Sequence, residues 1–211
     1  MKKYELTDDS ITFMGRKLFR IRAIRSFNDV TVGDLGGYVE KEENLSHDND
    51  AWISDNACIS GNACIYGDAR ISGNACIFGD ACIFGDACIS DNACIYGYAR
   101  IYGDARISGN ARIYGYACIY GDACISGNAR ISGNACIHSG ADYLCFQGLG
   151  SKNRNTTFFK CEDGHIHGSC GCFSGNLAEF ETKVKKTHGN NKYAKEYLAC
   201  IEVVKIHFEE E

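Results

Sequence analysis

Hydrophobic residues recur with a period of six along the middle of this chain. Isoleucine occupies every sixth position from Ile53 to Ile137, and alanine does so from Ala51 to Ala135, without an exception in either series. Because side chains alternate across a strand, the alanine and isoleucine of each block share one face and the residues beside them share the other. The fifteen blocks therefore predict short strands with an apolar inner face.

The polar positions mark where each strand ends. Most blocks close on Gly or Asp followed by Asn or Asp, which are residues that tolerate positive φ and favour bends. A helix is excluded, because a period of six matches neither 3.6 nor 3.5 and such regular glycines would break it. The predicted unit is a strand followed by a corner.

A second period of eighteen is contained in the first. One serine recurs at every third block, at Ser54, Ser72, Ser90, Ser108 and Ser126. An aromatic residue followed by Gly-Asp recurs with the same spacing at Tyr66, Phe84, Tyr102 and Tyr120. Three blocks therefore make one turn, and the turns stack into a triangular prism whose sides differ chemically.

This pattern resembles the hexapeptide-repeat, left-handed parallel β-helix proteins. Their usual repeat has an aliphatic residue in its first place and a small residue in its fifth, which Ile and Ala match here, whereas Ser, Tyr or Phe departs from the usual second place. The left hand follows from the resemblance alone, since crossovers are generally right-handed. The fold class that we predict is mainly β: a left-handed parallel β-helix of about five triangular coils, an N-terminal β cap and a small C-terminal α+β tail.

The two ends depart from the repeat, and we divide the chain into a cap at 1–50, the β-helix at 51–145 and the tail at 146–211. Residues 11–27 predict a hairpin with a Gly15-Arg16 turn, and the cap should cover the open first coil. Residues 20–57 resemble the N-terminal region of uncharacterised bacterial and phage hexapeptide-repeat proteins, some labelled transferases or polymer-forming proteins by fold analogy. That resemblance implies no catalytic residue.

The tail should contain a hairpin and two helices. We interpret residues 141–156 as the last partial coil and a linker, and predict a following hairpin with Asp163-Gly164 as its turn. Asn176 and Glu179 form a capping box for a helix that Gly189 ends. A last helix at about 191–208 carries one apolar stripe.

Composition and charge argue against nucleic-acid and membrane partners. The 211-residue chain has a net charge of −5, and the arginines of its repeat are scattered over three sides, so we expect no nucleic-acid partner. No stretch approaches the ~20 consecutive apolar residues of a membrane span, and the start MKKYELTDDS lacks the apolar segment of a secretion signal. We therefore expect a cytoplasmic protein without a membrane partner, whose fourteen cysteines stay reduced.

Acyl transfer is the enzyme activity that the resemblance implies, and it requires a histidine base. The repeat contains a single histidine, His138, and His47 precedes the first block. No loop interrupts the blocks to reach a neighbouring subunit. We expect His138 to replace an aromatic ring in its row, and we assign neither a catalytic residue nor a cofactor.

A zinc site in the tail is the other chemical possibility. The candidate ligands are close in sequence: Cys161, His165, His167, Cys170, Cys172 and His188. The tail has no CxxC pair, and cysteine often serves as a small apolar residue. We therefore assign no metal ligand.

Outward aromatic rows are the strongest candidate for a functional surface. Such rows would form a larger apolar stripe than isolated soluble proteins usually expose, although ring stacking could simply stabilise successive rungs. The predicted interface residues are Tyr66, Phe84, Tyr102 and Tyr120 on one side, Phe78, Tyr96 and Tyr114 on the next, and Tyr98 and Tyr116 at the corner between them.

The favoured hypothesis is a non-catalytic intracellular scaffold or binding protein that self-associates through these rows as a homo-oligomer, preferably a trimer. A protein or small ligand is the other partner we consider. The alternative is an acyl-CoA-dependent acyltransferase, and a third hypothesis is a phage-type protein that sequesters a small ligand or nucleotide.

Overall fold

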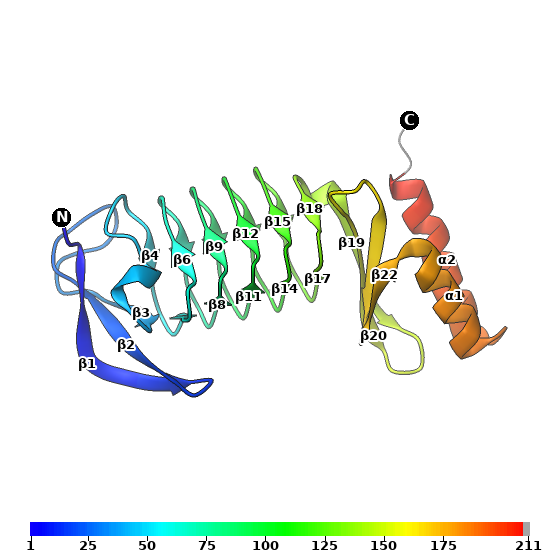
Figure 1. The fold of residues 1–211 in the computed structure, drawn as a ribbon, viewed down its shortest axis with the longest axis horizontal. Coiled ribbons are helices and arrows are strands. Elements are labelled where there is room, and N and C mark those ends of the chain that lie inside the picture. The colour runs from blue at the N-terminus through cyan, green and yellow to red at the C-terminus, as the bar shows by residue number, and fades with distance from the viewer. Residues whose placement is uncertain (209–211) are drawn as a thin grey trace.

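The computed structural model describes residues 1–208 and shows an elongated molecule with three parts (Figure 1). A stack of triangular coils lies in the middle, an antiparallel hairpin lies at the N-terminal end, and a small sheet with two helices lies at the C-terminal end. Residues 209–211 of the predicted tail lie outside the described residues. Neither helix has the length and apolar character that crossing a membrane requires.

Three parallel sheets form the sides of the prism, and each is named here by its first strand within the repeat. The β4 side has the order β16-β13-β10-β7-β4, the β6 side has the order β18-β15-β12-β9-β6, and the β5 side continues from β3 through β5-β8-β11-β14-β17. The repeat strands are β4 (Trp52–Ile53), β5 (Cys58–Ile59), β6 (Cys64–Ile65), β7 (Arg70–Ile71), β8 (Cys76–Gly79), β9 (Cys82–Ile83), β10 (Cys88–Ile89), β11 (Cys94–Gly97), β12 (Arg100–Ile101), β13 (Arg106–Ile107), β14 (Arg112–Ile113), β15 (Cys118–Ile119), β16 (Cys124–Ile125), β17 (Arg130–Ile131) and β18 (Cys136–Ile137).

The core confirms the predicted inner face. Every repeat isoleucine and alanine is at most 1% exposed. Strands pair with a register of eighteen residues, as Ile59 does with Ile77 and Ile77 with Ile95. Val39 pairs with Ile59 and Leu45 bridges to Ile65, so the cap adds part of a further turn and the solenoid has about six turns.

Backbone geometry at the corners explains the recurring glycines. A Cβ added to Gly67, whose φ is +75°, would lie 2.6 Å from the carbonyl oxygen of Gly85 on the next rung. Asp55 and Asp91 occupy other corners at positive φ. Their carboxylates accept hydrogen bonds from the Gly73 and Gly109 N–H groups at 2.9 and 2.8 Å, which offsets the strain.

An asparagine ladder reinforces the corner between the β4 and β5 sides. Each side-chain amide except the last donates to the carbonyl oxygen of the asparagine eighteen residues later, at 3.2–3.5 Å. The ladder comprises Asn56, Asn74, Asn92, Asn110 and Asn128.

The N-terminal end is a three-stranded antiparallel extension of the β5 side. It consists of β1 (Tyr4–Phe13), β2 (Arg16–Ala23) and β3 (Leu35–Val39), followed by the 3-10 turn η1 (Glu42–Asn44). The predicted Gly15-Arg16 turn is wrong by one position: Phe13 pairs with Arg16, and Met14 and Gly15 form the turn at φ 48° and 78°. A two-residue hairpin turn with two positive φ angles matches the twist of its strands.

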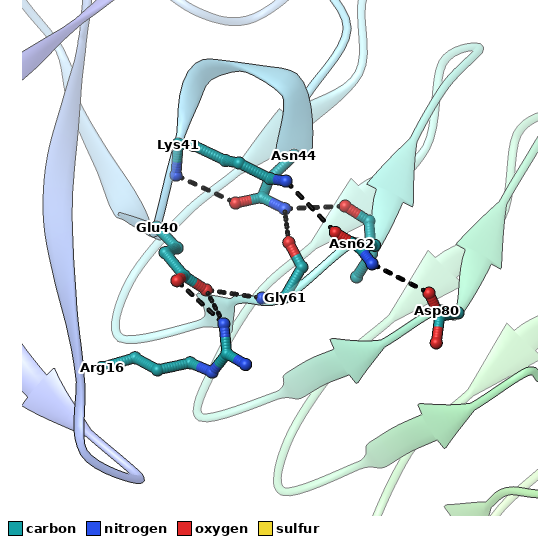
Figure 2. Close-up of polar contacts among 8 residues, drawn as sticks. Arg16, Glu40, Lys41, Asn44, Gly61, Asn62 and Asp80 are labelled. Atoms are coloured by element: carbon teal, nitrogen blue, oxygen red, sulfur yellow. Dashed lines mark hydrogen bonds and ion pairs between the residues drawn. The ribbon is translucent and has the colours of Figure 1, made fainter.

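Side chains replace the missing rung beneath the first coil (Figure 2). The buried Asn44 amide donates to the carbonyl oxygens of Gly61 and Ala63 at 3.1 and 2.8 Å. The Glu40 carboxylate accepts from the Gly61 N–H at 2.6 Å and is itself held by the Arg16 guanidinium at 2.8 Å. Backbone groups that would otherwise be unpaired at the open end are therefore satisfied.

The C-terminal end carries more strands than predicted. Its antiparallel sheet consists of β19 (Tyr143–Leu149), β20 (Arg154–Lys160), β21 (Ile166–Cys170) and β22 (Phe173–Asn176), after the 3-10 turn η2 (Gly140–Asp142). The linker predicted at 141–156 is therefore wrong. Its alternating Tyr-Leu-Cys-Phe segment pairs with β20 instead.

The loop that joins β20 to β21 has three residues rather than two. The Gly164 N–H bonds to the Cys161 carbonyl and the Cys161 N–H bonds to the His165 carbonyl, so Glu162 and Asp163 are the central turn residues. Gly164, at φ 79°, follows them in the left-handed region.

Two helices cover the far face of this sheet. The first, α1 (Leu177–His188), begins at the predicted Asn176–Glu179 capping box and ends at Gly189, and α2 (Lys192–Phe208) follows it. Their buried side chains form a second core with Phe158 of the sheet: Phe180, Val184, Ala194, Tyr197, Ile201 and Val204.

We predict that Gly67→Ala destabilises the protein much more than Gly133→Ala. Both glycines have positive φ, and that backbone cost is about 1–2 kcal/mol. Only at Gly67 does the added Cβ meet the next rung, since nothing lies within 4 Å at Gly133. Overpacking adds about 1–3 kcal/mol. Equal shifts of the urea unfolding midpoint would contradict this account of the corners.

We predict that Asn44→Ala lowers the unfolding free energy by about 2 kcal/mol or more, because two carbonyls lose their donor at a buried site. The matched control is Asn62→Ala. The Asn62 amide donates to Asp80 at 3.0 Å on the exposed surface, and its loss should cost less than about 0.5 kcal/mol. Urea unfolding of both variants provides the comparison, and an equal loss would count against the end-capping role of Asn44.

Candidate functional site

The β6 side carries the longest aromatic row. Successive ring centroids are 5.0–5.4 Å apart, with interplanar angles of 5–14°. The row comprises Tyr66, Phe84, Tyr102, Tyr120 and His138. Each ring follows a repeat isoleucine, so the eighteen-residue register places it above the ring of the preceding coil.

The β5 side carries a shorter row. Phe78, Tyr96 and Tyr114 stack at 5.0 Å and 4°. Phe13 of the N-terminal hairpin approaches the first ring edge-on at 6.5 Å. The two remaining positions of this row within the repeat are serines, Ser60 and Ser132, and both are only 3% exposed. Rings thus occupy the three middle rungs of this side, and the N-terminal hairpin contacts the first of them.

Two tyrosines connect these rows around one corner. Tyr98 and Tyr116 stack at 5.0 Å and 4°, and they are 52% and 62% exposed. In the chain, Tyr96 on the β5 side, Tyr98 at the corner and Tyr102 on the β6 side belong to one coil. All nine predicted interface residues therefore lie on one surface that wraps the edge between two sides, which we call the aromatic surface.

The tail does not cover the aromatic surface. In the described residues, β20 packs against β17 and β18 of the last coil, and α2 packs against β19, so the tail extends the prism axially (Figure 1). Because the tail lies elsewhere, a neighbouring molecule or a ligand could contact this surface.

Two outward groups on these sides have raised pKa values, which favours their neutral forms. A hydrogen bond with Cys118, together with burial, raises the pKa of Tyr120 to about 12. Burial and the neighbouring Cys58 and Cys94 raise the pKa of the Cys76 thiol to about 11. All fourteen cysteines are free. The Sγ atoms of Cys64 and Cys82 lie 3.8 Å apart, at thiol contact rather than bonding distance.

The two candidate histidines occupy structural positions. His138 stacks on Tyr120 at 5.0 Å, which is the aromatic replacement that the sequence predicts, and its Nδ1 is 4.0 Å from the Cys136 Sγ. His47 packs on the Tyr4 ring at 4.4 Å, and its Nε2 is 3.7 Å from the Glu42 carboxylate. Burial lowers the pKa of His47.

The tail sheet does not bring the six candidate zinc ligands into one site. Cys161 packs with the prism core, whereas the Cys170 Sγ lies 3.7 Å from the Tyr197 hydroxyl in the core between sheet and helices. His188 stacks on the same Tyr197 ring, and Cys172 is exposed. Within the described residues, the structure brings two of the six, Cys161 and His167, together with Asp163, which the sequence predicted only as a turn residue.

A basic pocket at the C-terminal end of the β5 side was also missed. It has a volume of about 470 Å³, and its charged lining residues are Arg130, Lys152 and Arg154. Arg130 belongs to the last coil and the other two flank the start of β20, so only the folded tail brings these cations together. Guanidinium and ammonium groups in such an arrangement suit a phosphate or carboxylate ligand.

Comparison with known proteins agrees with the solenoid. The repeat is similar to the YdcK beta solenoid repeat. The matches to that family fall at residues 99–115, 105–121 and 123–139. They support the resemblance of the repeat to hexapeptide-repeat β-helices.

One curated relative is an Escherichia coli (strain K12) protein named "Uncharacterized acetyltransferase YdcK". It is 36% identical over 81 residues, which cover 34% of this chain and 25% of the relative. The chain thus matches about a quarter of that relative's length.

Proposed function

We propose that this protein is a β-solenoid scaffold that associates laterally with copies of itself through the aromatic surface. The observation that supports it most is that rings from two sides and their shared corner form one surface, which the tail does not cover and which the N-terminal hairpin contacts only at Phe78. Apolar surface of this extent on a soluble domain generally marks an interaction site. Aromatic residues are also enriched in the cores of protein interfaces.

The cap and the tail cover much of the two ends of the solenoid, which favours lateral over end-to-end assembly. At the N-terminal end, the Asn44 amide and Glu40 carboxylate satisfy the backbone of the first coil. At the C-terminal end, the Arg130 N–H donates to the Thr157 hydroxyl at 2.9 Å and the Tyr143 hydroxyl donates to the Cys124 carbonyl at 3.2 Å. These contacts cover the ends of the β5 side, whereas β4 and β16 remain the edge strands of the β4 side among the described residues.

The shape of the surface favours a trimer. A triangular prism that points one edge toward a threefold axis presents the two sides flanking that edge to its two neighbours. In this chain, that edge is the corner with Tyr98 and Tyr116, and the flanking sides carry the other two aromatic rows. Each β5 side would pack against the β6 side of the next subunit.

Acyl transfer is the second candidate function, and the name of the curated relative favours it. The basic pocket at Arg130, Lys152 and Arg154 could accept the phosphates of an acyl-CoA donor, or those of a sequestered nucleotide. Within residues 1–208, however, each of the two candidate histidines is engaged elsewhere, one in a ring stack and the other beside Glu42.

We expect the purified chain to sediment as a trimer and Tyr98→Ser/Tyr116→Ser to weaken its association about tenfold or more. The two hydroxymethyl side chains remove apolar area from the centre of the proposed contact, and 1.4 kcal/mol corresponds to a factor of ten. Sedimentation velocity over a concentration series measures the change.

The matched control is Val32→Ser, which removes a 59% exposed apolar side chain from the N-terminal end. It should leave association unchanged. A monomer at every concentration of the unmodified chain, or equal weakening by Val32→Ser, would refute the lateral contact.

For acyl transfer, we expect no turnover of acetyl-CoA that depends on His138. The variant His138→Phe retains the ring stack while removing the base, so it should leave any measured hydrolysis or transfer rate unchanged. A loss of about a hundredfold or more in that variant, with its oligomeric state intact, would instead establish general-base catalysis and favour the enzyme.

A further inference from the structure

Three metal-binding groups meet where the tail hairpin contacts the prism. The Cys161 Sγ, a carboxylate oxygen of Asp163 and a ring nitrogen of His167 all lie within 4.8 Å of one another. Cys161 directly follows β20, Asp163 lies in the loop, and His167 lies in β21. Within residues 1–208, this is the one group of three such residues with this spacing.

Strand register explains why they converge. Phe159 pairs with His167, and Cys161 lies two residues beyond Phe159 on the same face of β20. Diagonal neighbours across an antiparallel pair are within reach of long side chains. The three-residue loop then turns Asp163 back, and its Oδ1 accepts the His165 N–H at 3.0 Å. That bond orients the carboxylate and leaves its second oxygen available.

The donor atoms have few competing partners. Among the described residues, no hydrogen bond involves the Cys161 thiol or the His167 ring. Cys161 is buried, His167 is half-buried and Asp163 is exposed. A cation would therefore enter from the Asp163 side and meet the sulfur at the inner end of the group.

The same three residue types could form a nucleophilic triad, but the environment opposes that role. A reactive cysteine is an exposed thiolate with a lowered pKa. Burial, and then the negative charge of Asp163, raises the pKa of the Cys161 thiol to about 12. When a cation binds such a thiol, the thiol releases its proton to solvent, because the positive charge of the metal offsets both burial and the charge of Asp163.

We propose that Cys161, Asp163 and His167 bind a Zn²⁺-class divalent cation, with the fourth coordination position open to water. Thiolate, imidazole and carboxylate together suit zinc, whereas Mg²⁺ and Ca²⁺ take oxygen ligands. Tetrahedral zinc with bonds of ~2.0–2.3 Å holds its ligand atoms roughly 3.5 Å apart. Small side-chain rotations would bring the three donors to that spacing.

The position of the site couples it to the junction between tail and prism. Cys161 forms an isolated bridge with Ala135 of the last coil, and the neighbouring Glu162 N–H donates to the Asn134 carbonyl at 3.0 Å. Binding at Cys161 therefore fixes the hairpin at its contact with the solenoid.

Cobalt titration of the reduced, chelator-treated full chain tests the proposal. We expect one Co²⁺ per chain, with a sulfur-to-cobalt charge-transfer band that Zn²⁺ removes and Mg²⁺ does not. Cys161→Ser should abolish the band, and His167→Gln should weaken binding at least tenfold. Asp163→Asn, at an exposed loop position, should also weaken binding at least tenfold while leaving the far-ultraviolet circular dichroism unchanged.

Two control variants test whether other thiols produce the charge-transfer band. Cys172→Ala removes an exposed cysteine outside the group, and Cys64→Ala/Cys82→Ala removes the thiol pair at 3.8 Å. Neither should change the stoichiometry or the band. The proposal is overturned if the band persists in Cys161→Ser, if it disappears with the Cys64/Cys82 pair, or if folded Asp163→Asn binds cobalt as tightly as the unmodified chain.

Discussion

The hydrogen-bond ladder between successive coils is the constraint on which the rest of the structure depends. Each strand of the repeat is only two to four residues long, so no strand could persist without the rungs on either side. The eighteen-residue register sets the inner isoleucines above one another and brings the corner backbones so close that a Cβ at Gly67 would touch the next rung. The absence of proline leaves every backbone N–H available to this ladder.

At both ends of the ladder, side chains form hydrogen bonds with backbone groups of the outermost coils. Asn44 and Glu40 supply a donor and an acceptor to the first coil, and Thr157 and Tyr143 do the same for the last. These residues take the place of a rung without offering a new edge. The two ends therefore stabilise the outermost coils of the solenoid.

The solenoid could be predicted from the sequence because the same residue pattern recurs in fifteen consecutive blocks. Unbroken Ile and Ala series predicted the core, and the serine and aromatic series predicted three unlike sides. The ends have no such redundancy. The position of the Met14-Gly15 turn depends on the pairing of Phe13 with Arg16, and β19 depends on β20, which the local pattern did not reveal. The group around Asp163 was missed because only the three-residue loop returns that carboxylate to Cys161.

The ladder does not account for the aromatic surface. Small outward residues serve the backbone equally well, as Ser72, Ser90 and Ser108 do on the β4 side with the same strand pairing. On the β5 side, the buried serines lie on the first and last rungs of the repeat, and rings occupy the three rungs between them. Stacking alone would favour rings on any side and at any rung. Their restriction to two sides and the corner between them is therefore better explained by a surface that contacts something outside the chain.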